Sequence, residues 1–226
     1  MSSSTRILLI VATLVGGLAA DMYTNIVGQT VIGLIVWLTL FSLLSDVDSD
    51  TRFMLMACLV IATAGEIVLS LGWGLYTYRL DNIPLFVPPG HVLLLLLGLS
   101  LARRMSDGAA LTIIGSAGIY SLAVAAAGTD TFGVLLFGIL LTASVVMPRQ
   151  RRLYASTFVL ALALELWGTW LGNWSWAREV PGTSLVTTNP PVAAGAFYCA
   201  LDALVVVASA RLDRVRHGFA GRRRLA

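Results

Sequence analysis

Eight apolar stretches make up most of this chain, and each is close to the roughly 20 residues that a helix needs to cross a bilayer. The composition agrees, because 58% of the residues are hydrophobic, 12% are charged and the mean hydropathy is +0.85, outside the range of soluble domains. We therefore expect an all-α polytopic membrane protein of about eight transmembrane helices. A count of seven follows if the short first, fourth or sixth stretch lies in the interface. The expected spans are 6–23, 26–45, 53–72, 88–102, 109–127, 132–148, 153–172 and 191–210.

The basic residues test this helix count independently. All fifteen are arginines, so a lysine Schiff base, and with it a retinal protein, is excluded. Eight spans with both termini on one side leave only Arg79 and Arg178 on the opposite side, which predicts cytoplasmic termini by the positive-inside rule. We expect a multi-pass protein of a prokaryotic inner membrane, with the 6–23 stretch retained as a helix rather than removed as a secretory signal. The basic tail 214–226 suggests an orientation signal or contact with anionic lipid, and not nucleic-acid binding.

The two halves of the sequence resemble each other, which predicts one four-helix unit over 1–105 and a second over 106–213. Each half has, in the same order, an arginine that opens a helix, a glutamate within that helix, an aromatic run and a proline pair. The arginines, glutamates and proline pairs are offset by 100, 99 and 102 residues: Arg52 and Arg152, Glu66 and Glu165, Pro88 and Pro190. Because four helices is an even number, the two units would share one orientation in the membrane.

Three acidic residues fall within the expected spans, where a charged group is costly and marks a functional site by default. Helical spacing places each acid on a polar stripe, and stripes that face a common interior would build a pocket. His91, at the start of the fourth span, could handle protons or simply cap the helix. The alternative for the acids is a protonated carboxyl that bonds across a helix interface. The candidate catalytic residues are Glu66, Glu165, Asp202 and His91.

Aromatic and polar residues cluster two to three helical turns after each glutamate. Tryptophan and tyrosine gather at membrane interfaces whatever the protein does, so an outer aromatic belt would explain them. Their closeness to the acids favours a second interpretation, in which they line a substrate site. The candidate substrate-binding residues are Trp73, Tyr76, Tyr78, Trp167, Trp170, Asn173, Trp174, Trp176 and Tyr198.

An acid beside aromatic rings suits chemistry on a hydrophobic polyene. A carboxyl group removed from water favours its protonated form and can donate a proton, while aromatic faces stabilise a developing carbocation. Protonation of an alkene, followed by addition of water or ring closure, needs no cofactor. We also expect no metal site, because two histidines are too few for a histidine cluster, and no disulfide between Cys58 and Cys199, which both lie in apolar runs.

Glu66 followed by GLYTY (74–78) and a proline-rich loop, with NWSW (173–176) and a second proline pair in the other half, resembles membrane-bound carotenoid-biosynthesis proteins. These include the long-chain carotenoid hydratases, and the pattern is also similar to the small membrane lycopene cyclases, which have duplicated helical units with paired acids. The resemblance implies an isoprenoid enzyme that uses Glu66, Gly74, Tyr76, Tyr78, Trp174 and Trp176. Two features depart from the family: the step from Glu66 to Gly74 is shorter, and TTNPP (187–191) only approximates the second loop.

The sequence is also compatible with two other functions. The intramembrane acids could relay protons or bind a cation in a small transporter or lipid carrier, or the chain could be a non-catalytic subunit or assembly factor of a membrane complex. In every case the expected partners are membrane lipids and a hydrophobic small molecule or lipid. A homodimer or a partner within a membrane complex is also compatible with the sequence.

Overall fold

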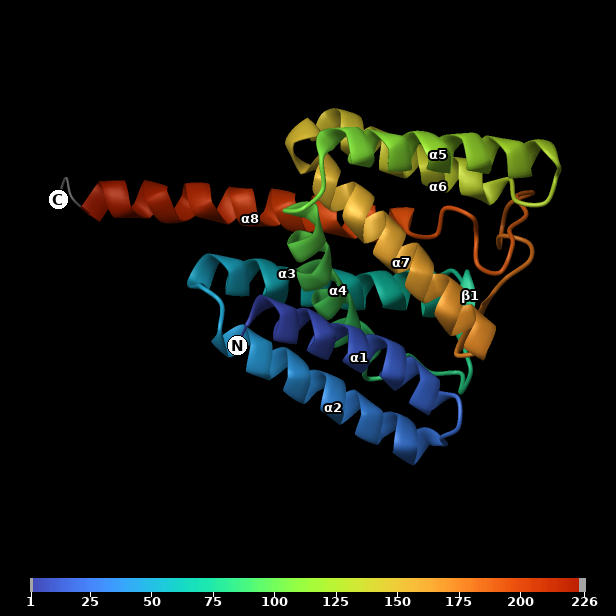
Figure 1. Ribbon diagram of the computed structural model, residues 1–226, viewed down its shortest axis with the longest axis horizontal. Coiled ribbons are helices and arrows are strands. Elements are labelled where there is room, and N and C mark those ends of the chain that lie inside the picture. Colours follow the sequence, from blue (N-terminus) through green and yellow to red (C-terminus); the bar gives the residue numbers. More distant parts are fainter. Residues whose placement is uncertain (1, 224–226) are drawn as a thin grey trace.

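The computed structural model describes the backbone of residues 2–223 and the side chains as far as residue 211. These residues form eight α-helices (Figure 1), as the apolar stretches predict. The predicted tail, 214–226, lies outside the described side chains. The helices are α1 (Ser3–Asp21), α2 (Ile26–Ser45), α3 (Ser49–Glu66), α4 (Val87–Ala102), α5 (Asp107–Ala126), α6 (Phe132–Val146), α7 (Arg151–Leu171) and α8 (Ala196–Arg223).

Five helical segments are long and apolar enough to cross a membrane: Ser3–Asp21, Ile26–Ser45, Ser49–Gly72, Asp107–Ala126 and Pro148–Leu171. They indicate a membrane-embedded protein. The helices α4 and α6 are apolar but shorter, with 16 and 15 residues. Short polar side chains begin several helices by accepting free backbone N–H groups. Ser2, Asn25, Asp48 and Ser106 cap α1, α2, α3 and α5 in this way.

The last helix begins later than the sequence predicts, whereas the third span ends at Gly72 as predicted but with a π-helical segment. The last helix was expected from residue 191, but it begins at Ala196, because the Asp130 carboxylate accepts the Val192 N–H and the Thr188 hydroxyl and holds 188–192 as a turn. The third span continues past Glu66 as a π-helix, η1 (Ile67–Gly72). Such π-helical turns concentrate at functional sites, and this one begins directly after the buried glutamate.

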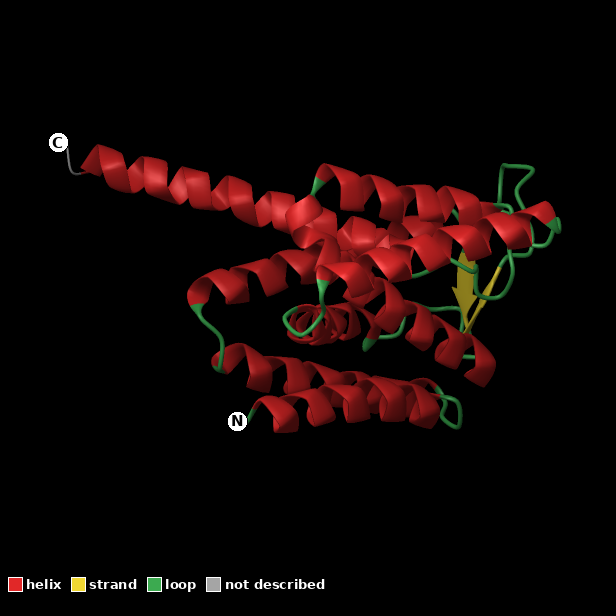
Figure 2. Cartoon of the chain, turned by 45° about the horizontal axis from the view of Figure 1, so that its top comes forward, coloured by secondary structure: helices red, strands yellow, loops and turns green. Residues whose placement is uncertain are grey.

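Four helices form the centre of the molecule. The helix α3 packs against α4 and α8, and α7 packs against α4 and α8. The hairpin α1–α2 lies along one side of this group and the hairpin α5–α6 along the other (Figure 1). The N-terminus and the far end of α8 point to the same end of the molecule (Figure 2), while the strands lie at the opposite end.

A two-stranded antiparallel sheet joins the two halves at that end. The strand β1 (Tyr76–Tyr78) pairs with β2 (Trp174–Trp176). Alternate residues of a strand point to opposite faces, so the four tyrosines and tryptophans are buried while Thr77 and Ser175 are exposed. The sheet therefore presents four aromatic side chains to the interior. These strands were not predicted from the sequence.

Asp21, at the end of α1, anchors this end of the molecule. Its side chain is 1% exposed and accepts hydrogen bonds from Gln29 Nε2 (3.0 Å) and Asn173 Nδ2 (2.9 Å). Arg79 forms an ion pair with it at 3.4 Å and donates to its backbone carbonyl. These contacts fix both strands to the first helical hairpin, since Arg79 follows β1 and Asn173 precedes β2.

Candidate functional site

Glu66 ends α3 and is 6% exposed. Its Oε2 accepts hydrogen bonds from the hydroxyl groups of Tyr76 (2.9 Å) and Tyr78 (2.7 Å). Both donors come from β1, where a spacing of two residues puts them on the same face. On the other side, Oε1 lies 2.9 Å from His91 Nε2. Three donor side chains therefore converge on one buried carboxyl group.

Glu165, in α7, has a closely related environment in the second half of the chain. It is also 6% exposed, and its Oε2 accepts hydrogen bonds from the indole N–H groups of Trp174 (2.8 Å) and Trp176 (3.0 Å). Both donors again come from alternate positions of a strand, here β2. Indoles thus replace phenols as the donors to the second acid.

The pairing of β1 with β2 places the aromatic donors of Glu66 next to those of Glu165. Tyr76 pairs with Trp176 and Tyr78 with Trp174, and the ring centroids of these pairs lie 4.8 and 6.1 Å apart. On the helical side, Tyr198 of α8 stacks on His91 at 4.7 Å and lies close to the Glu165 carboxyl. The four aromatic donors form one layer next to both acids.

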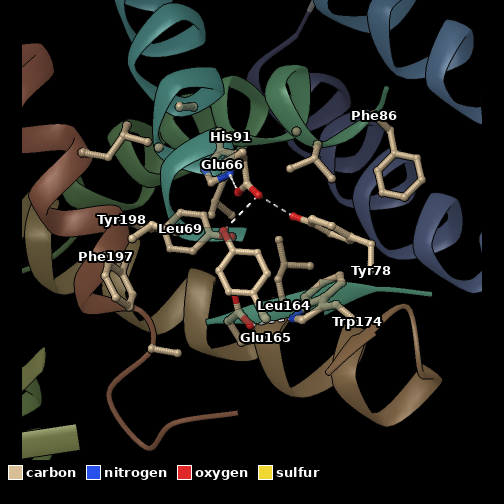
Figure 3. Close-up of a pocket in the computed structure, with 18 of the residues that line it drawn as sticks. Glu66, Leu69, Tyr78, Phe86, His91, Leu164, Glu165, Trp174, Phe197 and Tyr198 are labelled. Carbon is tan, nitrogen blue, oxygen red and sulfur yellow. Dashed lines mark hydrogen bonds and ion pairs between the residues drawn. The ribbon is translucent and has the colours of Figure 1, made fainter. Parts of the chain in front are cut away.

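Both glutamates line a single cavity of about 430 Å³ (Figure 3), which is within the size range of small-molecule sites. Among the lining residues, the polar groups come mainly from the two acids, His91 and the sheet. Most of the remaining surface is apolar. It includes Leu14, Leu18, Val36, Ile61, Leu69, Phe86, Val87, Leu94, Leu164, Phe197 and Leu201.

The two acids differ in the charge that their partners can supply. Glu66 faces an imidazole, which can carry a positive charge. Glu165 is held by neutral indole N–H donors, and indole cannot accept a proton from it. Glu66 and Glu165 thus lie in different electrostatic environments within one cavity.

The structure brings together eight of the candidate residues, all of which line this cavity: Glu66, Glu165, His91, Tyr76, Tyr78, Trp174, Trp176 and Tyr198. Asp202 does not line it. This acid is 3% exposed and lies close to Thr157, Cys199 and Cys58. Its Oδ2 has no hydrogen-bond partner among the described residues. It belongs to a separate buried cluster farther along α8.

Four candidate binding residues also lie outside the cavity lining. Trp73 donates its indole N–H to the Pro181 carbonyl, and Trp167 donates to the Val15 carbonyl. Trp170 is 75% exposed, as a residue of a membrane-interface belt would be. Asn173 donates a hydrogen bond to the Asp21 carboxylate, as described above. These contacts assign the four side chains to loop closure, helix packing and the outer surface.

Several residues that line the cavity, and the two strands, were not predicted from the sequence. The segments YTY and WSW alternate large aromatic and small polar residues, which is the period-two signal of a strand. The strands could therefore have been predicted from this pattern. The contribution of Phe197, whose ring stacks on Trp176 at 6.0 Å, had no such signal, because an apolar residue at the start of an apolar helix is ordinary. The same holds for Leu69 and Phe86.

Within the described residues, no group of three or more His, Cys, Asp or Glu side chains could hold a metal ion. Comparison of the chain with protein-family models, with curated proteins and with solved structures finds no match. The cavity and its side chains are therefore the features that bear on function.

The contact between Gly168 and Trp174 gives a first prediction. A Cβ added at Gly168 would overlap the Trp174 ring, so Gly168→Ala should displace a donor of Glu165 and destabilise the protein by about 1–3 kcal/mol. Thermal unfolding in detergent measures this. Gly115→Ala is the matched control, because a Cβ there meets nothing within 4 Å. Equal melting temperatures for the two variants would show that Trp174 does not need the glycine.

Proposed function

We propose that this protein is an integral membrane enzyme that acts on a hydrophobic isoprenoid or carotenoid by protonating an alkene. The observation that carries the proposal is the arrangement of two buried carboxyl groups in one mostly apolar cavity, beneath a layer of four aromatic rings. An apolar cavity at membrane depth selects a hydrophobic substrate. The two acids and His91 are then the groups proposed to exchange protons with that substrate.

In the proposed reaction Glu165 is the proton donor. Its carboxylic acid gives a proton to one carbon of the alkene, and the other carbon becomes a carbocation. The π faces of Tyr76 and Trp176, whose rings lie 4.8 Å apart, are suited to stabilise this cation. Phe197 adds a third ring next to Trp176. No redox change occurs, so the reaction needs neither an oxidant nor a reductant.

Glu66 and His91 are the proposed proton acceptors. In a hydration, water adds to the cation and its extra proton passes to the His91–Glu66 pair. In a cyclisation, a second alkene attacks the cation and the proton leaves a neighbouring carbon to the same pair. The contacts of Glu66 with Tyr76, Tyr78 and His91 hold its carboxyl group in place for this role.

The carotenoid part of the proposal follows from the resemblance of the GLYTY and NWSW segments to carotenoid-biosynthesis proteins. The aromatic residues of these segments supply the donors to the two acids, which supports a role in the site for them. We further propose eight membrane spans with cytoplasmic termini in a prokaryotic inner membrane, because the arginines concentrate at one end of this topology.

The proposal is tested by a pigment profile. The chain is expressed in a bacterium that accumulates lycopene or its elongated derivatives, and the pigments are separated by liquid chromatography and identified by mass spectrometry. We expect a new product that is one water heavier, or an isomeric cyclic product. An unchanged profile with folded protein in the membrane would reject the carotenoid assignment for these substrates. Proton-driven uptake of a solute into vesicles would instead support a transporter.

A further inference from the structure

The exposed part of the cavity lining lies on helices. Val68 of η1 and Leu204 of α8 line the cavity and are 59% and 57% exposed. Ala64 of α3 is also exposed, and next to it Gly65 is half-buried. Gly17 of α1 also lines the cavity. These positions belong to apolar helical segments, so the opening faces the hydrocarbon layer if the chain spans a bilayer as proposed.

The opposite side of the cavity, toward the loops, is closed. The four aromatic side chains of the sheet are 7–8% exposed, and the loop that follows β2 is hydrogen-bonded to this end of the molecule. Trp73 bonds to Pro181 of this loop, and the Trp176 N–H donates to the Asn189 side chain. An apolar molecule therefore meets a closed aromatic layer from the aqueous side and an open apolar rim from the membrane side.

The size of the cavity limits what it can hold. A volume of about 430 Å³ corresponds to a small ligand and is less than a complete carotenoid occupies. A long substrate must leave most of its length outside, and the apolar rim is the part of the boundary that suits a hydrocarbon chain.

We propose that the cavity takes only the end group of a long, linear, apolar chain, which enters sideways from the bilayer past α3 while the rest of the chain stays in the lipid. This inference rests on the proposed function and specifies its substrate class. The end group then lies between Glu66 and Glu165, under the aromatic layer (Figure 3). Soluble or compact molecules of similar chemistry are poor ligands.

Gly65 is the position at which this proposal can be tested. It lines the cavity, and a Cβ added there meets nothing within 4 Å. The first atom of a larger side chain therefore meets no neighbour, and a leucine at this position should occupy part of the opening. The same substitution at Gly115, where a Cβ also meets nothing within 4 Å, lies on α5 away from the cavity and serves as the matched control.

The experiment is photolabelling in phosphatidylcholine vesicles that contain a linear isoprenoid hydrocarbon with a diazirine at one end. Peptides that contain Leu69 and Leu201, both in the cavity lining, are analysed by mass spectrometry. We expect labelling of both peptides in the unmodified chain and in Gly115→Leu, and about tenfold less in Gly65→Leu, which is about 1.4 kcal/mol of lost binding. If Gly65→Leu does not fold, Val68→Trp provides a second obstruction at the rim.

Equal labelling of Gly65→Leu and Gly115→Leu, with both variants folded, would overturn the sideways route. So would stronger labelling of the cavity by a short, water-soluble diazirine than by the long hydrocarbon. Photolabelling needs no turnover, so the two proposals can fail separately. If the cavity is labelled but the pigment profile shows no product, the enzyme proposal is rejected and the sideways route is supported. If product forms but Gly65→Leu is labelled as strongly as the unmodified chain, the enzyme proposal is supported and the sideways route is rejected.

Discussion

Replacing Glu165 by glutamine should remove product formation while the protein stays folded. The glutamine carbonyl can accept the same two indole hydrogen bonds that Glu165 Oε2 accepts from Trp174 and Trp176, so the strand β2 keeps its anchor. The amide has no acidic proton to give to an alkene. Since general acid catalysis contributes about 10²–10⁴-fold to a rate, we expect a loss of that order.

The measurement is the amount of product in the pigment profile, normalised to the amount of folded protein in the membrane. Glu179→Gln is the matched control, because Glu179 is exposed in the loop after β2 and should leave the yield unchanged. A Glu165→Gln variant that forms product at the level of this control would remove Glu165 from the proposed mechanism. Glu66→Gln is a less clean test, since an amide cannot accept from phenols on one side and from His91 on the other without turning an N–H toward a donor.

Replacing Asp21 by alanine should cause the largest loss of stability among the substitutions considered. The change removes the acceptor shared by Gln29, Arg79 and Asn173 and leaves a partly buried guanidinium without its counter-charge. Breaking a buried pair in this way costs about 3–5 kcal/mol. We expect a strongly lowered melting temperature in detergent and little folded protein in the membrane.

The comparison is with Asp107→Ala, which breaks a second aspartate–arginine pair. Asp107 and Arg152 are connected by two short hydrogen bonds, at 2.6 and 2.7 Å, but their side chains are 66% and 45% exposed. Solvent screens such a pair, so its loss should change stability little despite the shorter distances. Similar melting temperatures for Asp21→Ala and Asp107→Ala would contradict the importance of burial in this argument.

The helices could be predicted from the sequence because lipid imposes a simple rule. A segment in hydrocarbon must satisfy its own backbone hydrogen bonds, so apolar length alone gave eight helices. The boundary at residue 191 was wrong because a tertiary contact decides it. Asp130, which is distant in sequence, holds 188–192 as a turn, and no local pattern reports that contact.

The site could be predicted in part. The cost of burying an acid identified Glu66 and Glu165, and the polar stripes that carry them suggested a common pocket. The same reasoning selected Asp202, whose cluster lies elsewhere on α8. Helical periodicity shows on which face of its helix a residue lies, but not which residues of the neighbouring helices it lies beside. The aromatic runs were harder still, because Trp170 at the surface and Trp174 in the cavity are equally compatible with an interface belt.

The pairing of β1 with β2 makes the two acids mechanically dependent on each other. Each strand carries the donors to the acid of its own half, and the backbone ladder connects the strands at three residue pairs. A movement that separates β1 from Glu66 must also displace β2, or break the backbone hydrogen bonds between the two strands. Both carboxyl groups would then lose their donors in one cooperative event. Opening toward the loops would expose both acids to water together, so the proposed cation could form only while the aqueous side of the cavity is closed.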